Sequence, residues 1–476
     1  MLWSLKRFMK NWLKKTATDK NFVKIFAFLK IALFVVLFSW ISFFPEPIQG
    51  QYAIYTRVFL GLFFLLLFFK EGSLNNFLDL QDWPLWVFLA CLSAGLVSAQ
   101  DKKIAWETYF NLVFNLFFLF YIGKALVSEK KNKGWIALVI CISSSLVAGI
   151  GILELHFGRN ILYENFIRNP FYLKYITGFA RPMSTQLAAP VLGGFLLGCL
   201  PFSFILFKKT TLCSKLLGAT GIVLNTVVVI LTLSRGALLG LIVIIALYLL
   251  VEKRFSLAII FLIITFTSSV AFSYLPWPLS KLGVGGIITD KLSPRSKLNI
   301  VGLKPITKEH SLDKSHNFEE FGRNWTYEDS IVSNYRLVRL NMAIRMIRDH
   351  PFVGIGFQHF RIRFYEYYPH KQKIPFDIMI ADNMYLTILA ETGIIGFFGF
   401  SVFVFSLVKK GWKKFMLLNY ESDKRNMLLG SLMAFIGLLI NMAGYELFYW
   451  SNQYVLFCII IGFINACLNN QKAKVN

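Results

Sequence analysis

Long apolar segments alternate with short polar segments along almost the whole chain. A helix that crosses a bilayer needs about 20 mostly apolar residues, and twelve segments approach or exceed that length. They cover residues 25–44, 52–69, 83–99, 104–122, 134–156, 187–207, 214–233, 235–251, 255–275, 383–408, 427–448 and 450–468. The pattern therefore predicts an all-α integral membrane protein with about twelve transmembrane helices.

Three of these segments carry weaker signals. The segment 104–122 contains Glu107, and a single residue separates 214–233 from 235–251.

The basic N-terminus ahead of 25–44 resembles a signal peptide. That apolar run is too long for a signal peptide, however, and it leads into Pro45-Glu46-Pro47 with no small-residue cleavage site, so we expect an uncleaved first span.

The basic residues of the short loops gather on one side of the predicted membrane. Cytoplasmic loops carry an excess of Lys and Arg, which predicts that both termini are cytoplasmic. Three regions follow from this topology: spans one to nine in 1–275, an external loop in 276–382, and spans ten to twelve with a cytoplasmic tail in 383–476.

The external loop is patterned in its second half. Residues 281–330 are rich in Ser, Lys, Asp and Asn, whereas Ser333-Asn334 is suited to cap a helix that His350-Pro351 would stop at Asp349. This helix would have an apolar stripe made of Leu337, Leu340, Ile344 and Ile347. A turn at Gly354-Ile355-Gly356 and a short helix within 358–368 would follow.

Composition agrees with a membrane protein. Hydrophobic residues make up 56% of the 476 residues and charged residues 16%, and the mean hydropathy is +0.57. The net charge of +24 does not indicate nucleic-acid binding, because most basic residues lie between apolar segments as topology signals. All six cysteines lie outside the long loop, so no disulfide or zinc framework is expected.

Arginines at the outer membrane face are the first candidates for chemistry. Arg235, between Ser234 and Gly236, could hold a phosphate group with its planar guanidinium, or it could simply reach from a helix to the interface. On the loop helix, Arg336 and Arg339 share one face at roughly 100° per residue, whereas Arg345 and Arg348 lie on another. A solvated helix face is the simpler explanation for any one of these loop arginines taken alone.

The loop re-enters the membrane at Asp382-Asn383. A carboxylate at the mouth of a span is suited to act as a general base. Taken alone, however, Asp382 is fully explained as the cap of the helix that follows. The loop histidines are His316, His350, His359 and His370. They show no metal-ligand spacing with nearby carboxylates, so no metal site is expected.

Three motifs together resemble the O-antigen ligase and O-antigen polymerase superfamily over roughly residues 235–400. They are Ser234-Arg235-Gly236-Ala237-Leu238-Leu239-Gly240; Tyr335-Arg336-Leu337 with Asp349-His350-Pro351-Phe352-Val353-Gly354-Ile355-Gly356; and Asp382-Asn383-Met384-Tyr385-Leu386 with Ala390-Glu391-Thr392-Gly393-Ile394-Ile395-Gly396. Arg181-Pro182-Met183-Ser184 is similar to a less specific basic segment of the family. The family also has about twelve spans and a large periplasmic loop.

The resemblance implies a metal-independent glycosyltransferase of the bacterial inner membrane, without a cofactor and with a periplasmic active site. Its donor would be a glycan on undecaprenyl diphosphate, and its acceptor the lipid A core or a growing glycan. Arg235, Arg336 and Arg339 would hold the diphosphate, and Asp382 would be catalytic. Arg181, His370 and Asn383 would be candidate substrate-binding residues.

One residue departs from the ligase pattern. Ligases of the family usually have His directly before the Asn at position 383, and this chain has Asp382. His370 lies twelve residues upstream, too far to be assumed a replacement. This departure weakens the assignment as a ligase and makes a polymerase a near-equal interpretation. A lipid-linked glycan flippase or another transporter is the alternative of a different class, and it leaves the patterned loop unexplained.

Overall fold

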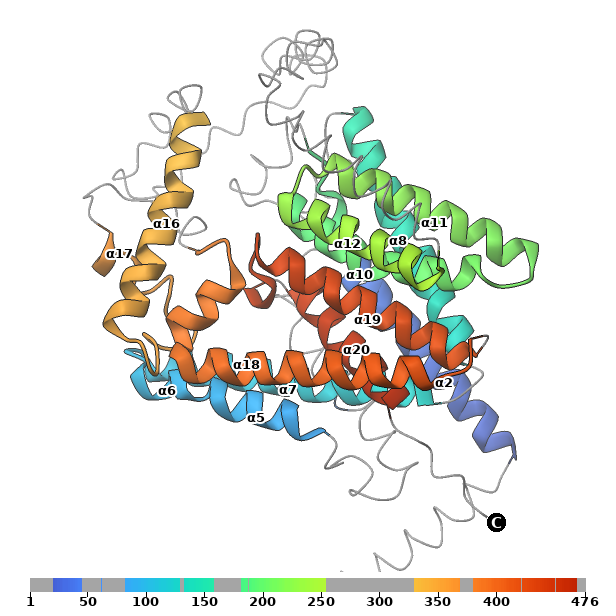
Figure 1. Ribbon diagram of the computed structural model, residues 1–476, viewed down its shortest axis with the longest axis horizontal. Coiled ribbons are helices and arrows are strands. Elements are labelled where there is room, and N and C mark those ends of the chain that lie inside the picture. The colour runs from blue at the N-terminus through green and yellow to red at the C-terminus, as the bar shows by residue number, and fades with distance from the viewer. Residues whose placement is uncertain are drawn as a thin grey trace, which may run out of the picture.

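The computed structural model describes residues 20–44, 61, 82–128, 132–157, 181–186, 188–253, 329–368, 380–420, 422–449 and 451–468 (Figure 1). The regular elements in these ranges are helices. They are α2 (Lys20–Phe43), α5 (Trp83–Leu92), α6 (Ala94–Ser98), α7 (Lys102–Ser128), α8 (Asn132–Phe157), η3 (Ser184–Gln186), α10 (Ala189–Phe207), α11 (Leu212–Leu231), α12 (Arg235–Val251), α16 (Asp329–Asp349), α17 (Phe364–Tyr367), α18 (Met384–Leu417), α19 (Asp423–Met442), η6 (Leu447–Tyr449) and α20 (Ser451–Leu468).

Six of these helices are long and apolar enough to cross a membrane: α7, α8, α10, α11, α18 and α19. Shorter apolar helices lie at Ile31–Phe43, Trp83–Ser98, Arg235–Val251 and Asn452–Leu468. Helices are therefore found at ten of the twelve predicted spans. Segments 52–69 and 255–275 lie outside the described residues, apart from residue 61. The protein is an integral membrane protein, and the count of twelve crossings stays a prediction.

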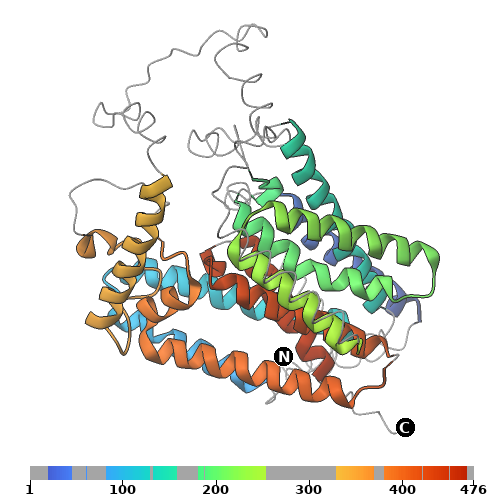
Figure 2. The same cartoon turned by 45° about the horizontal axis from the view of Figure 1, so that its top comes forward.

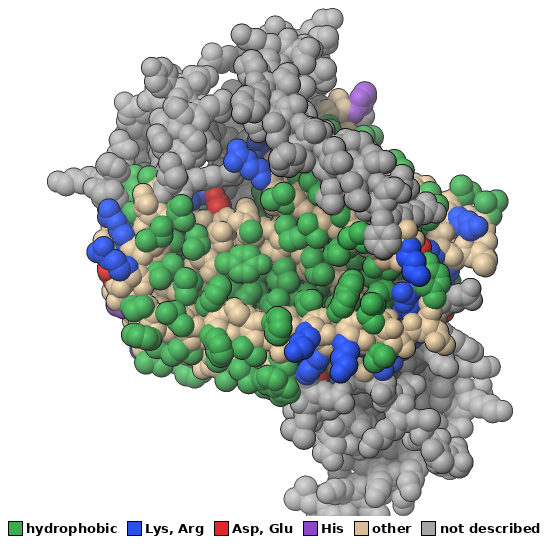
Figure 3. Space-filling view, in the orientation of Figure 1, with side chains coloured by type: hydrophobic (Ala, Val, Ile, Leu, Met, Phe, Trp, Pro, Cys, Tyr) green, Lys and Arg blue, Asp and Glu red, His purple; other side chains and the backbone are tan. Residues whose placement is uncertain are grey.

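Burial separates lipid-facing helices from a central one. Almost every residue of α10 is buried, whereas α11 exposes Leu212, Leu216, Val223, Val227 and Ile230. Such exposed apolar side chains form a broad field in the space-filling view, with Lys and Arg toward its edges (Figure 3). An apolar exterior of this kind matches hydrocarbon as the surrounding solvent.

Neighbouring helices approach closely through glycines. A Cβ on Gly123 of α7 would lie 2.6 Å from the carbonyl oxygen of Ile459, and one on Gly462 of α20 would lie 2.3 Å from that of Phe120. Small residues allow such contact between membrane helices. α7 and α20 therefore pack side by side. The hydrogen bond from the Tyr454 hydroxyl to Leu112 O, nearer the start of both helices, shows that they run in the same direction.

The helices alternate in direction, so their ends form two groups. At the first, which we call the site end, α8, α11 and α19 finish and α7, α10, α12, α18 and α20 begin. At the second, the basic end, lie Lys133, Lys208, Lys209, Lys253, Lys409, Lys410, Lys413, Lys414, Lys424 and Arg425. In Figures 1 and 2, α16 stands at the site end beside the first turns of α18.

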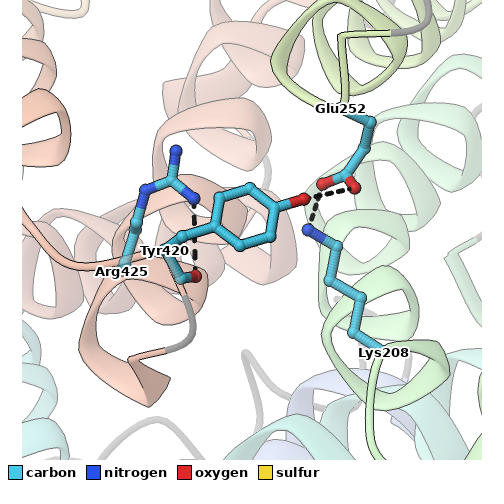
Figure 4. A network of polar contacts seen from close by, with 4 residues as sticks. All are labelled: Lys208, Glu252, Tyr420 and Arg425. Atoms are coloured by element: carbon cyan, nitrogen blue, oxygen red, sulfur yellow. Dashed lines mark hydrogen bonds and ion pairs between the residues drawn. The ribbon is translucent and has the colours of Figure 1, made fainter.

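A polar network ties three elements together at the basic end (Figure 4). Lys208, after α10, pairs with the carboxylate of Glu252, after α12, and the Tyr420 hydroxyl donates to the same carboxylate at 2.9 Å. Arg425 of α19 lies over the Tyr420 ring at 4.7 Å. The turn between α18 and α19 is thereby fastened to α10 and α12.

The start of the loop helix and part of its apolar stripe differ from the prediction. α16 begins at Asp329, so Ser333 and Asn334 lie inside the helix and do not cap it. The predicted apolar stripe faces the protein only in part: Leu340 is 36% exposed and Ile344 50%, whereas Ile347 packs beside the buried Met342, Ala343 and Met346. These three pack on Ile355, Phe360, Phe364, Ala381 and Ala390. α16 is thus rotated toward the turn that follows it, a partner that periodicity alone does not reveal.

Candidate active site

α18 is broken one third of the way along, at Gly393, whose φ is 64° and ψ −166°. The turn after α16 fills the break. Backbone N–H groups of Ile355 and Gly356 donate to the carbonyls of Ala390 (2.8 Å) and Glu391 (3.1 Å), and Ile394 N donates to Pro351 O (2.8 Å). Hydrogen bonds lost inside the helix are replaced by bonds to the loop, so the loop is joined to a membrane helix through its backbone.

Glycine is required where these backbones meet. Gly354 and Gly393 both have positive φ values, of 72° and 64°. A Cβ on Gly354 would lie 2.3 Å from Glu391 C, and one on Gly393 would lie 2.2 Å from Phe352 O. The glycines of the two family-like motifs therefore serve the docking of the loop on α18.

Glu391 fixes the chain that continues from the turn. The residue is only 3% exposed, and its carboxylate accepts hydrogen bonds from Gln358 N (2.9 Å) and Phe360 N (3.1 Å). A buried carboxylate with two backbone donors is well satisfied. Glu391 is therefore explained as a structural clamp at the break in α18.

His359 fastens the same turn to the link between α6 and α7. The ring is buried, its Nδ1 lies 2.8 Å from Phe357 O, and its Nε2 accepts from Asp101 N at 2.9 Å. This arrangement fits a neutral ring with its hydrogen on Nδ1. His359 thus has a structural role that its sequence context did not show.

The docked turn places α16 beside the first residues of α18, where Arg339 pairs with Asp382. Their side chains are 13% and 21% exposed. Asp382 has φ +53°, in the left-handed region that a few residue types such as Asp tolerate. Two residues that the sequence assigned separate roles, diphosphate binding and catalysis, are therefore direct partners.

Asn383, and not Asp382, caps α18. Its side-chain oxygen accepts from Tyr385 N (3.0 Å) and Leu386 N (3.2 Å), and its Nδ2 donates to Ala443 O (3.0 Å). The capping explanation for Asp382 is thus wrong, because the next residue satisfies the N-terminal N–H groups. Asp382 is left outside the helix, in the position that the docked loop faces.

Glu446 holds the other side of this segment from the turn between α19 and α20. Its Oε1 lies 2.7 Å from Ala381 N and 2.6 Å from Thr387 Oγ1. The carboxyl group is fully buried, and burial raises its pKa to about 8, with the charges of Glu391 and Asp382 adding to the effect and hydrogen bonds from Thr387 and Ala381 N opposing it. The sequence placed Glu446 inside predicted span 427–448, but α19 ends at Met442 and Glu446 lies in the turn beyond it. An acidic residue in an otherwise apolar run was the available signal for this residue.

The same turn reaches Arg235. A Cβ on Gly444 would lie 3.4 Å from Gly236 N, and one on Gly236 would lie 3.0 Å from Asn441 O. Arg235 is exposed at the first position of α12 and pairs with no carboxylate among the residues that the structure describes. The N-termini of α12 and α18 thus meet around residues 441–446, and helix N-termini favour anions.

The other predicted site residues are only partly placed. The structure describes Arg336 only as a position within α16 and not its side chain. His370 is not among the described residues. The expected approach of Arg235 to Arg336 therefore stays a prediction. Arg181 is exposed directly ahead of a buried segment whose Met183 N and Ser184 N donate to Glu154 Oε2 at 2.9 and 2.6 Å.

Metal ligands and cavities give no further site in the described ranges. No three His, Cys, Asp or Glu side chains gather closely enough there to hold a metal ion. Two shallow crevices lie toward the basic end, one lined by residues that include Asp82 and Lys410, the other by residues that include Lys208 and Tyr248. Neither touches the Arg339–Asp382 pair, which lies at the opposite end of the bundle.

Fold and site define a helical membrane protein in which the turn after α16 is built into the break of the long apolar helix α18. Residues 220–401 match the protein-family model described as O-antigen ligase. This part of the helical membrane protein, from α11 to the first half of α18, is therefore similar to the O-antigen ligase family. No curated protein matches the chain.

Proposed function

We propose that this protein is a membrane glycosyltransferase of the O-antigen ligase and polymerase type. It moves a glycan from an undecaprenyl-diphosphate carrier to a sugar hydroxyl, on the lipid A core or on a growing glycan. The reaction breaks the bond between the anomeric carbon and the diphosphate oxygen and forms one to the acceptor oxygen. The diphosphate leaves with the carrier lipid, and the acceptor hydroxyl loses its proton.

The observation that carries this proposal is the meeting of Arg339 and Asp382 at the site end, within the matched domain. The docking of residues 351–356 on α18 holds both in place. Arg235 begins α12 around the same turn, 441–446. Cationic side chains and helix N-termini suit a diphosphate leaving group, and the carboxylate suits an acceptor hydroxyl.

Each residue has one role in this proposal. Arg235, Arg336 and Arg339 hold the diphosphate, and Asp382 orients the acceptor hydroxyl and takes its proton late in the reaction. Asn383 starts the helix that carries the site and Arg181 and His370 contact the glycan. During the reaction the Asp382 carboxylate leaves its ion pair with Arg339 and binds the acceptor hydroxyl. The Arg339 guanidinium then turns to the diphosphate.

The proposed topology places the site end in the periplasm and the basic end, with both termini, in the cytoplasm of a bacterial inner membrane. Its support is the concentration of Lys and Arg at the basic end, as cytoplasmic loops require. Residues 276–382 are then the periplasmic loop. This orientation gives the site access to a donor presented at the outer leaflet.

Gene deletion followed by analysis of the surface glycan tests the proposal and separates its two forms. If the protein is a ligase, its loss is expected to leave complete glycan on the lipid carrier. If the protein is a polymerase, its loss is expected to leave single repeat units on the lipid A core. Asp382 in place of His favours the polymerase. Unchanged surface glycan would contradict both.

A further inference from the structure

The two oxygens of the Glu446 carboxyl group differ in their hydrogen bonds. Oε1 accepts from Ala381 N at 2.7 Å and from the Thr387 hydroxyl at 2.6 Å. Asn383 O, which lies 3.1 Å from the same hydroxyl, already accepts from Thr387 N at 3.0 Å. Both donors of this segment are therefore directed to Oε1.

The second oxygen, Oε2, favours the protonated form of the carboxyl group. Glu446 is 0% exposed, and its Oε2 is buried with no hydrogen-bond partner among the described residues. A buried ionised oxygen without a donor or a counter-charge is costly. The charged groups facing this site are Glu391 of α18 and Asp382, both negative, with Arg339 of α16 directed to Asp382 and Arg235 across the turn on α12.

The position of Glu446 connects it to Asp382. Its Oε1 accepts the N–H of Ala381, the residue before Asp382, and contacts Thr387 in the first turn of α18. Ala443, in the same turn as Glu446, accepts from Asn383, the residue after Asp382. Asp382 is therefore fixed on both sides by one turn, and a left-handed aspartate needs such support to persist.

We propose that Glu446 is a positioning residue that works in its protonated form: it holds Ala381 and α18 so that Asp382 keeps its left-handed conformation and meets Arg339. This inference rests on the proposed function for its effect on the rate. Loss of the proton would place a third negative charge beside Asp382 and Glu391 and would weaken the support. Transfer is therefore expected to fall as the pH rises through the titration of Glu446.

The direction of this dependence follows from the proton count. Burial raises the pKa of Glu446 from 4.5 to about 8, so the folded protein binds a proton that the unfolded chain releases between these values. The stabilisation is complete below pH 4.5 and is lost as the pH rises through about 8. The supported conformation of Asp382 is thus expected to persist at neutral pH and to weaken above pH 8.

Glu446→Gln is the informative variant, because an amide keeps an oxygen for Ala381 N and Thr387 Oγ1 and cannot ionise. In membranes that hold the full-length protein, it is expected to transfer glycan like the parent at pH 7 and to lack the parent's fall above pH 8. Glu446→Ala is expected to lose about a hundredfold in rate, the usual effect of a small displacement at a reacting group. Glu252→Gln, at the basic end, is the matched control and should keep the parent's profile.

Infrared difference spectroscopy on the purified protein tests the protonation without using transfer. The parent and Glu252→Gln should show a protonated carboxyl band that titrates near pH 8, absent from Glu446→Gln. Thr387→Val should move the band to higher pH by roughly half to one unit, since it removes a hydrogen bond that lowers the pKa. This variant serves equally if Glu446→Gln does not accumulate.

Two results would overturn the inference: a titrating band that persists unchanged in Glu446→Gln, or folded Glu446→Gln that is inactive at every pH. A parent protein that shows the band but transfers no glycan would instead contradict the proposed function, and Glu446 would still be a protonated positioning residue. The two failures are therefore distinguishable.

Discussion

Replacement of Asp382 by Asn separates catalysis from structure most cleanly. Asn keeps the size of the side chain and tolerates a φ of +53°, and the cap of α18 is untouched because Asn383 supplies it. The variant removes the charge that pairs with Arg339. Since both side chains are partly exposed, the loss of this pair should cost about 0–1 kcal/mol of stability.

The effect on the rate should be much larger. Orientation of the acceptor and proton acceptance are worth about 10²–10⁴ in rate, which corresponds to roughly 3–5 kcal/mol in the activation barrier. Asp382→Asn should therefore accumulate normally and lose most transfer. Quantitative immunoblotting and glycan analysis in a deletion strain measure the two quantities.

Asp423→Asn, in the first turn of α19 at the basic end, is the control and should transfer normally. Asp382→His is the companion variant, because recovered activity would give this position the role that His has in the ligases. Parent-like transfer by Asp382→Asn would refute the assignment of Asp382 as catalytic.

Further predictions address the anion site, the loop and the topology. Arg235→Ala should abolish transfer and Arg235→Lys should restore little of it, since Lys lacks the planar fork; full activity of the Lys variant would argue against bidentate phosphate binding. Gly393→Ala should lower the amount of folded protein, because a φ of 64° with a ψ of −166° is essentially restricted to Gly and costs other residues about 1–3 kcal/mol, and because its Cβ would lie 2.2 Å from Phe352 O; limited proteolysis of the loop, with Gly149→Ala as a control in open space, measures this. Membrane-impermeant labelling from outside should modify a Cys at position 311 and miss one at position 413, and the reverse pattern would contradict the topology.

The hydropathy of the sequence was sufficient for the membrane-spanning framework. The long apolar helices α7, α8, α10, α11, α18 and α19 lie where apolar runs predict them, and even Glu107 in the weak segment 104–122 did not prevent a helix. Hydrocarbon allows little else, because a backbone in a bilayer must satisfy its hydrogen bonds internally.

The relation between the loop and the bundle was not predictable in this way. The break at Gly393 depends on backbone bonds to residues about 40 positions earlier, and neither segment shows this partner in its own periodicity. The same distant contact rotates α16, so the stripe at Leu340 and Ile344 faces outward and Met342 and Met346 face inward. The pairing of Arg339 with Asp382 follows from that rotation.

Glu446 was missed for a related reason. Its importance lies in which backbone N–H it accepts, and that depends on the meeting of the α19–α20 turn with residue 381. The sequence did identify the neighbouring Asp382 and Asn383, but it considered the cap for Asp382, whereas the structure gives the cap to Asn383.

Reconstitution in lipid vesicles tests the central claim most directly. Purified protein is supplied with an undecaprenyl-diphosphate-linked glycan and a glycan or lipid A core acceptor, and both the extended acceptor and the freed carrier diphosphate are measured. The proposed function predicts equal amounts of both products from the parent protein and almost none from Asp382→Asn. Movement of the intact donor across the bilayer with no freed carrier diphosphate would contradict it and would identify a transporter.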